Sequence, residues 1–580
     1  MTIEFQERAI DRHFADFLCK QVDGDYGELF RLVVSLASRA VGGGNLCLNL
    51  ADIAGQTVRV NGKELLLPRL EGLLELLGKS SVVSVNGQRY RPLVLDAAGR
   101  LYLYRYWQHE HLLAMMILQK VAAVTDVLDE MKLQEALERL FPANTDHHQK
   151  EAAMVALQRQ FCVISGGPGT GKTSTVVRIL ALLLEQEGRK QRIAMATPTG
   201  KAAARLKQSV NDIRQSLNCS DEVKLAIPDN VVTIQRLLGS ISGSTRFRHS
   251  AQNPLPYDTV ILDEASMVAL PLMSLLVAAL KPNARLILLG DRDQLASIEE
   301  GAVLGDICGA GEGSPASPLS ASLVVLKKNY RFQPGSGLAE ISRAVNAGLE
   351  MEALELLTGN EAGTLHWQSL PNHEELRNAL STNVVKGYQG YLEAASPKEA
   401  LERFDQFRIL CALRDGPYGV SGLNNIIEKI LAREELIAPL SLFYSGRPIL
   451  VTVNDYAMSL FNGDTGILLP DPDNSALLKA FFPTSDGEVR SIPPERLPDH
   501  ETAYAMTIHK SQGSEFDCIL MLLPPVDSEL LTRELIYTGM TRAKKRVEIW
   551  ADEAVFCSAV KKKTERSSGL RDALRWNERQ

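Results

Sequence analysis

Gly166-Gly167-Pro168-Gly169-Thr170-Gly171-Lys172-Thr173 is the stretch that decides the fold of this chain. It fits the pattern G-x-x-x-x-G-K-[ST] and stands between an apolar run at 161–165, typical of a strand, and an amphipathic segment at 172–186, typical of a helix. The glycines let backbone N–H groups turn toward phosphates, and the helix N-terminus adds a favourable dipole. The pattern predicts a nucleotide site made by Gly167, Pro168, Gly169, Thr170, Gly171, Lys172, Thr173 and Ser174.

An acidic pair completes the predicted site. The apolar run Val260-Ile261-Leu262 ends in Asp263 and Glu264, about 90 residues after the phosphate loop. A lone Asp-Glu pair is usually a solvated strand end, but this spacing favours a catalytic role. We expect Lys172 to reach the β and γ phosphates, Thr173 and Asp263 to hold Mg²⁺, and Glu264 to deprotonate the attacking water. ATP and Mg²⁺ are therefore the predicted cofactors.

Around these motifs, short apolar runs alternate with helical segments, which predicts an α/β fold with a parallel sheet. Strands are expected at 192–196, 259–262 and 286–289, a helix at 267–280, and a second α/β region from about Ser322. Residues 238–258 are rich in Gly, Ser and Pro and predict an inserted loop or hairpin. From about 427 to 500, short strands separated by turn residues predict a small inserted β-barrel.

The first 140 residues contain no nucleotide motif. Helical periodicity at 4–22 and 109–129, with strand-like runs at 81–85 and 101–105, predicts a mixed, mainly helical accessory domain.

Bulk composition restricts the class of protein. The chain has 580 residues, 45% of them hydrophobic, and a net charge of −7, which argues against a protein that coats nucleic acid but allows a local basic groove. It has no run of about 18 apolar residues and no leader pattern, so neither a membrane span nor secretion is expected. The eight cysteines are scattered without C-x-x-C spacing, which predicts reduced thiols in the cytoplasm and no metal centre.

Seven segments, in order, resemble the motifs of superfamily 1 DNA helicases. They are 196–203 (motif Ia), 233–238 (Ib), 261–267 (II), 289–295 (III), 329–332 (IV), 507–516 (V) and 537–543 (VI). The chain is most similar to the RecD family, on the strength of Gln149-Lys150-Glu151-Ala152-Ala153, the run 246–256 and the run 290–297. The resemblance covers about residues 145–550, and it departs at Gln235, where several relatives have His.

This resemblance implies two RecA-like P-loop NTPase motor domains, a mainly helical N-terminal domain and an inserted small SH3-like β-barrel. The implied boundaries are 1–140 for the N-terminal docking domain, 141–325 for the first motor domain with a hairpin at 238–258, 326–426 and 504–580 for the second motor domain, and 427–503 for the barrel.

The resemblance also assigns roles to residues. Gln149 would contact adenine, Gln294 would sense the γ-phosphate, and Arg331 and Arg542 would act as arginine fingers that neutralise charge in the transition state. Contacts to DNA phosphates, which give affinity without sequence preference, would come from Thr197, Thr199, Lys201, Thr233, Thr507, His509, Lys510 and Ser511. Each threonine or serine here is also of a type that caps helices.

The implied function is an ATP-dependent 5′→3′ translocase on single-stranded DNA. It would be a helicase subunit of a RecBCD-type complex (exodeoxyribonuclease V) that acts in double-strand break repair and recombination, with RecB-like and RecC-like partners in a heterotrimer. No acidic cluster with nuclease spacing is recognised in the sequence. Two alternatives stay open: a stand-alone RecD-like helicase and a non-translocating P-loop ATPase.

Overall fold

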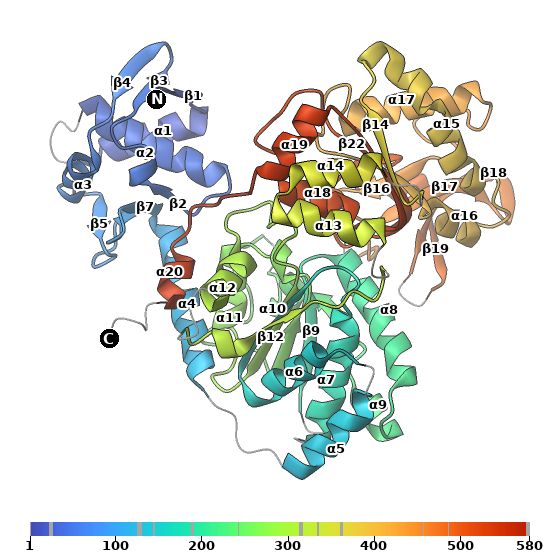
Figure 1. The fold of residues 1–580 in the computed structure, drawn as a ribbon, viewed down its shortest axis with the longest axis horizontal. Helices are drawn as coiled ribbons and strands as arrows, with labels where there is room; N and C mark the ends of the chain where they lie inside the picture. Colours follow the sequence, from blue (N-terminus) through green and yellow to red (C-terminus); the bar gives the residue numbers. More distant parts are fainter. Residues whose placement is uncertain are drawn as a thin grey trace.

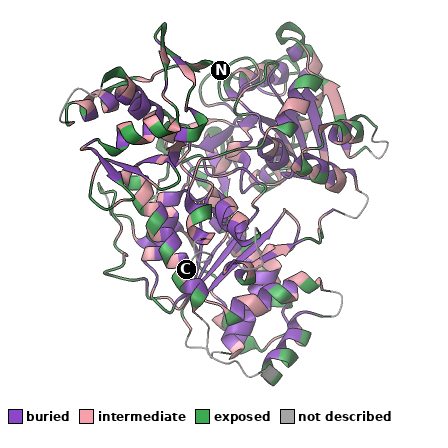
Figure 2. Ribbon diagram, turned by 60° about the vertical axis from the view of Figure 1, so that its left-hand side comes forward, coloured by how far each residue is buried: buried purple, intermediate pink, exposed green. Residues whose placement is uncertain are grey.

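The computed structural model describes residues 2–22, 27–123, 130–142, 145–186, 191–241, 243–312, 317–332, 336–359, 363–455, 457–484 and 487–575. Two parallel sheets covered by helices form its centre, and the N-terminal part and a small antiparallel sheet lie at opposite sides of the view in Figure 1. Figure 2 shows buried residues along the central sheets and exposed residues on the outer helices. None of the helices in the described part of the chain has the length and apolar character needed to span a bilayer.

The first lobe contains a six-stranded, all-parallel sheet in the order β10-β9-β11-β12-β8-β13. Its strands are β8 (Phe161–Gly166), β9 (Ile193–Thr197), β10 (Val231–Thr233), β11 (Thr259–Leu262), β12 (Arg285–Gly290) and β13 (Leu323–Leu326). Phe161 and Val163 face one hydrophobic core, and Cys162 and Ile164 face the other. Because both faces are buried, the strands are apolar at nearly every position, as parallel strands require.

Helices cover both faces of this sheet. One face is covered by α5 (Glu130–Leu140), α6 (His147–Gln158), α7 (Lys172–Gln186), α8 (Gly200–Ser216) and α9 (Asp221–Ala226). The other is covered by α4 (Tyr104–Ala122), α10 (Ile234–Leu238), α11 (Leu270–Ala278) and α12 (Val303–Glu312). Helices α4 and α5 lie within the range expected for the N-terminal domain, yet they complete the cores of the first lobe.

Two details of this lobe differ from the sequence predictions. The helix expected at 267–280 is divided into a short 3-10 turn, Ala265–Met267, and α11, which begins at Leu270. Pro271 lies in the first turn of α11, where a missing N–H costs nothing. The second α/β region does not begin at Ser322, because β13 pairs in parallel with β8 and closes the first sheet.

The second lobe contains a five-stranded parallel sheet in the order β14-β23-β22-β15-β21. Its strands are β14 (Leu365–Ser369), β15 (Phe407–Cys411), β21 (Ala505–Thr507), β22 (Phe516–Leu522) and β23 (Ala543–Ala551). Its helices are α13 (Gly337–Ala347), α14 (Glu350–Thr358), α15 (His373–Leu392), α16 (Pro397–Phe404), α17 (Val420–Arg433), α18 (Arg533–Met540) and α19 (Glu553–Lys561).

An antiparallel sheet is inserted between β15 and β21, in the order β19-β18-β17-β16-β20. Its strands are β16 (Pro448–Val451), β17 (Thr465–Asp471), β18 (Asn474–Pro483), β19 (Val489–Ile492) and β20 (His500–Thr502). The expected start of the strand region at 427 is wrong, because 427–433 continue α17. Ile427, Ile430 and Leu431 follow helical spacing and are buried against the second lobe.

The segment 238–258 contains no regular strand in its described residues. Two isolated antiparallel bridges, Ser240 with Phe247 and Ser250 with Asn253, give it a hairpin-like path after α10. Leu255 returns to the core of the first lobe.

The N-terminal part combines helices with short strands. Its helices are α1 (Ala9–Cys19), α2 (Gly27–Gly42) and α3 (Leu70–Gly78). One small sheet contains, in order, β1 (Thr2–Phe5), β3 (Thr57–Val60) and β4 (Lys63–Leu66). A second small sheet contains, in order, β2 (Cys47–Asn49), β7 (Arg100–Leu103), β6 (Leu93–Leu95) and β5 (Val83–Val85). The helix expected at 4–22 begins only at Ala9, because residues 2–5 pair with β3. The far end of the helix expected at 109–129 lies outside the described residues.

The C-terminal tail, residues 562–575, runs back from α19 to the junction of the first lobe and the N-terminal part (Figure 1). It ends in α20 (Leu570–Arg575), which packs against α4 and α12. Leu46 N donates to Ser567 O at 2.9 Å, and Arg566 Nη1 donates to Gly301 O at 2.8 Å. The tail therefore connects three parts of the chain that are distant in sequence.

Candidate active site

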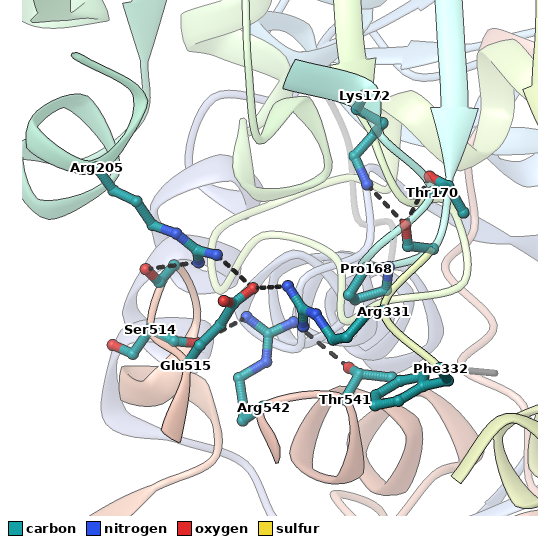
Figure 3. A network of polar contacts seen from close by, with 12 residues as sticks. Pro168, Thr170, Lys172, Arg205, Arg331, Phe332, Ser514, Glu515, Thr541 and Arg542 are labelled. Carbon is teal, nitrogen blue, oxygen red and sulfur yellow. Dashed lines mark hydrogen bonds and ion pairs between the residues drawn. The ribbon is translucent and has the colours of Figure 1, made fainter. Parts of the chain in front are cut away.

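The phosphate loop joins β8 to α7. Gly169 and Gly171 have φ values of +81° and +83°, in the left-handed region that favours glycine. Lys172 Nζ donates to the carbonyl oxygens of Gly166 at 2.6 Å and Gly167 at 3.1 Å, and Figure 3 shows its side chain turned back over the loop. The ammonium group therefore lies over the loop and is held there by two of its carbonyl oxygens.

Acidic side chains stand at the carboxyl edge of the same sheet. Asp263 follows β11, and Asp291 follows β12, the strand beside β8. Burial, reinforced by the charge of Glu264, raises the pKa of Asp263 to about 6, and burial also raises the pKa of Asp291. Gln294 Nε2 donates to Asp291 Oδ2 at 3.0 Å. Keeping neighbouring buried carboxylates negatively charged costs free energy. A divalent cation bound between them would offset this cost with its positive charge.

Glu264 has an unusual backbone. Its φ of 54° and ψ of 40° are left-handed, which costs a non-glycine residue about 1–3 kcal/mol. Strain of this kind persists only where the surroundings impose it, and it is concentrated at functional sites. The backbone N–H of Glu264 donates to Asp263 Oδ1 at 2.8 Å, so the two acids are held as one unit.

The segment that leads to the second lobe lies directly on the phosphate loop. Asn329 Nδ2 donates to Pro168 O at 2.9 Å, and Tyr330 N donates to Gly169 O at 2.8 Å. A Cβ atom added to Gly169 would lie 2.5 Å from Arg331 Cβ. The glycine is therefore needed for this close approach as well as for its φ.

Helix α18 of the second lobe reaches the same place. The hydroxyl of Tyr537 donates to Asp291 Oδ2 at 3.0 Å, and a Cβ atom on Gly167 would lie 2.8 Å from that hydroxyl oxygen. Leu295 N, in the first lobe, donates to Thr538 Oγ1 at 2.9 Å. The phosphate loop and its acids thus lie at the interface between the two lobes.

Arg331 and Arg542 lie close together at this interface (Figure 3). Arg331 Nη2 forms an ion pair with Glu515 Oε1, while its buried Nη1 has no hydrogen-bond partner among the described residues. Arg542 Nε donates to Thr538 O at 3.0 Å. Burial lowers the pKa of Arg542, although the nearby charge of Glu264 opposes this effect. A buried guanidinium nitrogen without an acceptor costs folding free energy, unless another group such as a phosphate oxygen accepts its hydrogen bond.

Gln149 lies in α6 beside the loop. Its side chain is 3% exposed, and its Nε2 donates to Thr170 O at 3.2 Å. The amide therefore contacts the loop directly, and a Cβ atom added to Gly171 would lie 2.5 Å from Gln149 Nε2.

The DNA-contacting candidates of the first lobe lie at the carboxyl ends of β9 and β10. Thr199 caps α8 by accepting from Ala202 N, and Thr233 caps α10 by accepting from Arg236 N. Thr197 is buried and donates to Thr199 O at 2.8 Å. Burial lowers the pKa of Lys201, and the charge of Asp405 in the second lobe opposes that shift.

The candidates of the second lobe lie at the end of β21 and in the turn that follows it. Thr507 Oγ1 accepts from Lys510 N at 3.2 Å, and Lys510 Nζ pairs with Glu501 at 2.6 Å. Ser511 is fully buried and donates to Ile508 O at 2.7 Å, and burial lowers the pKa of His509. Ser511 and Thr197 are buried and hydrogen-bonded within their own turns, whereas the other candidates are partly exposed.

Sequence reasoning missed several residues of the site. Glu515, Asn329 and Tyr537 fall inside quoted motifs, but nothing in their spacing singles them out. Arg205, on α8, forms an ion pair with Glu515 from the first lobe. One arginine on an amphipathic helix gives no signal in sequence, because its partner lies 310 positions away.

Three family models match the chain. An AAA domain model matches residues 149–300, a UvrD-like helicase C-terminal domain matches residues 502–549, and the N-terminal domain of RecBCD enzyme subunit RecD matches residues 7–102. Two parallel sheets that meet at a phosphate loop, with a helicase model matching the second, define a superfamily 1 helicase motor.

Relatives in sequence narrow the assignment from this superfamily to one family. RecBCD enzyme subunit RecD of Mycobacterium tuberculosis is 39% identical over 97% of this chain and 94% of its own length. The ATP-dependent RecD2 DNA helicase of Deinococcus radiodurans is 30% identical, over 66% of this chain and 46% of its own length. This chain belongs to the RecD family.

Solved helicase structures are more distant. The Bacteroides Pif1 helicase in complex with ADP-AlF3 and ssDNA is 18% identical, covers 73% of this chain and 94% of its own, and has a TM-score of 0.38. The family assignment therefore rests on the sequence relatives.

Proposed function

We propose that this chain is the RecD-type motor subunit of a RecBCD-type complex, an ATP-dependent helicase that moves 5′→3′ on single-stranded DNA. One observation carries the proposal: the phosphate loop of the first lobe is contacted by the second lobe and by the segment that leads to it, through Asn329, Tyr330 and Tyr537. A nucleotide at this interface would couple its own cleavage to the relative position of the lobes, which is a two-state device for motion.

Each site residue then has a chemical role. Lys172 would place its charge on the β and γ phosphates, and Glu264 would take the proton of the attacking water. Gln294, held by Asp291, would report the presence of the γ-phosphate. Arg331 and Arg542 would neutralise charge that develops in the transition state, which is worth about 10³–10⁵ in rate for such arginines.

The acidic edge of the first sheet fits Mg²⁺. Asp263 is the carboxylate that would hold the ion, with the hydroxyl of Thr173 at the start of α7. The raised pKa of Asp263 shows the cost of a buried anion beside Glu264. A bound divalent cation supplies charge neutralisation for the phosphates and removes that cost.

DNA would lie across the carboxyl ends of β9, β10 and β21, where the loops of both lobes present hydroxyl and ammonium groups. Thr199, Thr233 and Thr507 would contact phosphates, with His509 and Lys510 from the second lobe. The antiparallel sheet at 448–502 would be the SH3-like domain of that lobe.

Association with RecB-like and RecC-like partners is favoured over a stand-alone helicase. The match to RecD subunits spans nearly the full chain, whereas the match to the RecD2 helicase covers less than half of that protein. We place the complex in the cytoplasm, a reducing compartment compatible with the free thiols of all eight cysteines.

The test is unwinding of duplexes with a 5′ or a 3′ single-stranded tail, by the chain alone and by the complex captured with it from its native host. The proposal predicts a capture that contains two large partner chains and unwinding from the 5′ tail. Robust unwinding by the isolated chain at nanomolar concentration would favour the stand-alone helicase, and preference for the 3′ tail would refute the polarity.

A further inference from the structure

Glu515 is shared between two arginines from different lobes. It lies in the motif V segment, immediately before β22, and its Oε1 pairs with Nη2 of Arg331 and with Nη2 of Arg205 (Figure 3). Burial alone would raise the pKa of Glu515, but the two guanidinium groups overcome this effect and lower it to about 2. The carboxylate is therefore charged at any physiological pH.

Arg205 approaches from the first lobe. It is the sixth residue of α8, the helix that begins immediately after the motif Ia loop. Its Nη1 also contacts the motif V turn at Gly513 O, at 3.5 Å, and a Cβ atom on Gly513 would lie 3.8 Å from Ala202 Cβ. Arg205 thus connects the two loops that the proposed function places on DNA.

Arg331 lies on the other side of the same carboxylate. The pair with Glu515 fixes one end of its guanidinium group, and its second nitrogen, Nη1, is buried without a partner among the described residues. Since Arg331 N is also held by Asn329 Oδ1 at 2.8 Å, both ends of the side chain are restrained beside the phosphate loop. A shift of Glu515 would therefore shift the guanidinium group of Arg331.

We infer that Arg205 is a positioning residue for ATP hydrolysis, which holds Glu515 across the interface so that Glu515 aims Arg331 at the phosphate loop. The inference rests on the proposed function, because it assumes that hydrolysis uses Arg331 and responds to DNA. It gives a physical route between the two sites: DNA that moves α8 against the motif V turn moves the Arg205–Glu515 pair, and with it Arg331. The side chain of Arg205 is 40% exposed, so it has room to change its partner.

The test compares Arg205→Ala, Arg205→Lys, Glu515→Gln and the double variant Arg205→Ala/Glu515→Gln in steady-state ATP hydrolysis with saturating single-stranded DNA. Misplacement of a catalytic group by about 1 Å can cost about 10²-fold. We therefore expect Arg205→Ala to lower kcat by between about 10- and 100-fold with little change in the KM for ATP. Arg205→Lys should recover part of the loss, because it keeps the charge.

A double-mutant cycle separates positioning from general damage. If Arg205 acts through Glu515, the double variant should be no slower than the worse single variant, whereas independent effects would multiply. Arg214→Ala is the matched control, since it removes an arginine from the same helix about 13 Å further along the axis, and it should keep wild-type kcat. Thermal unfolding of every variant checks that the fold is intact.

The outcomes distinguish this inference from the proposed function. A wild-type chain whose hydrolysis ignores DNA would refute the proposed function itself. A DNA-stimulated wild type with an equally active Arg205→Ala variant would overturn only the inference. Multiplicative losses in the double variant, or an Arg205→Lys variant no better than Arg205→Ala, would also overturn it.

Discussion

Gly169→Ala is the substitution that tests the contact between the phosphate loop and the second lobe most sharply. Gly169 has a φ of +81°, and an L side chain in the left-handed region costs about 1–2 kcal/mol. The added Cβ would lie 2.5 Å from Arg331 Cβ and 2.8 Å from Asn329 Oδ1, whereas ordinary contact begins at 3.4 Å. The segment that carries Arg331 must therefore withdraw by nearly 1 Å.

A displacement of that size should reduce catalysis far more than binding. We expect kcat for ATP hydrolysis to fall by about 10²-fold, because a positioning error of about 1 Å has that effect. Nucleotide binding should be retained, since Lys172 and the loop N–H groups remain. Steady-state hydrolysis with single-stranded DNA gives kcat, and equilibrium binding of a fluorescent ATP analogue gives the affinity.

Gly62→Ala is the matched control. Gly62 has a φ of +79°, but nothing lies within 4 Å of its added Cβ, so this variant carries the backbone strain without the clash. It should lose stability as Gly169→Ala does but hydrolyse ATP at the wild-type rate. Equal, near-wild-type turnover in both variants would refute the reasoning that Arg331 must lie against the loop.

Three further predictions concern separate parts of the molecule. Lys172→Gln should abolish ATP hydrolysis while the chain stays folded, because it removes the ammonium charge over the loop together with its hydrogen bonds to Gly166 O and Gly167 O; near-wild-type turnover would defeat the site assignment. Thr538→Val leaves the buried N–H of Leu295 without its acceptor, so denaturant unfolding should show a loss of about 1–3 kcal/mol; an unchanged midpoint would contradict the interlobe contact. Glu110 accepts from Gly569 N in the C-terminal tail, and burial raises its pKa to about 7. Because the folded pKa lies above the unfolded value, the charged carboxylate costs stability as pH rises toward 7. Between pH 6 and 8 the wild type should therefore lose about 1 kcal/mol relative to Glu110→Gln. Thermal unfolding across that range checks the prediction, and a constant difference between the two proteins would contradict it.

The elements around the phosphate loop were predictable because local sequence defines them. Helix α7 and strand β11 begin and end at the predicted residues, since an apolar run bounded by glycines or acids leaves little freedom. The strand β13 could not be assigned in this way. Its apolar run resembles any other buried strand, and only pairing with β8 shows which sheet it joins.

The residues of the candidate site also fall into two groups, those that a local sequence pattern identifies and those that only the packing of the lobes brings together. Motif residues such as Lys172 and Asp263 could be proposed from the sequence, because their chemistry requires fixed neighbours in sequence. The shared carboxylate of Glu515 was not found, because Arg205 and Arg331 reach it from different lobes. Sequence patterns encode contacts within a motif, whereas contacts between motifs depend on how the lobes pack.

The central claim is that ATP is cleaved between two lobes whose arrangement responds to DNA. The most direct measurement is the steady-state rate of Mg·ATP hydrolysis by the purified wild-type chain, with and without a single-stranded oligonucleotide. A many-fold acceleration by the oligonucleotide is the predicted result. The same rate with and without it, in a chain that is folded and binds ATP, would contradict the account.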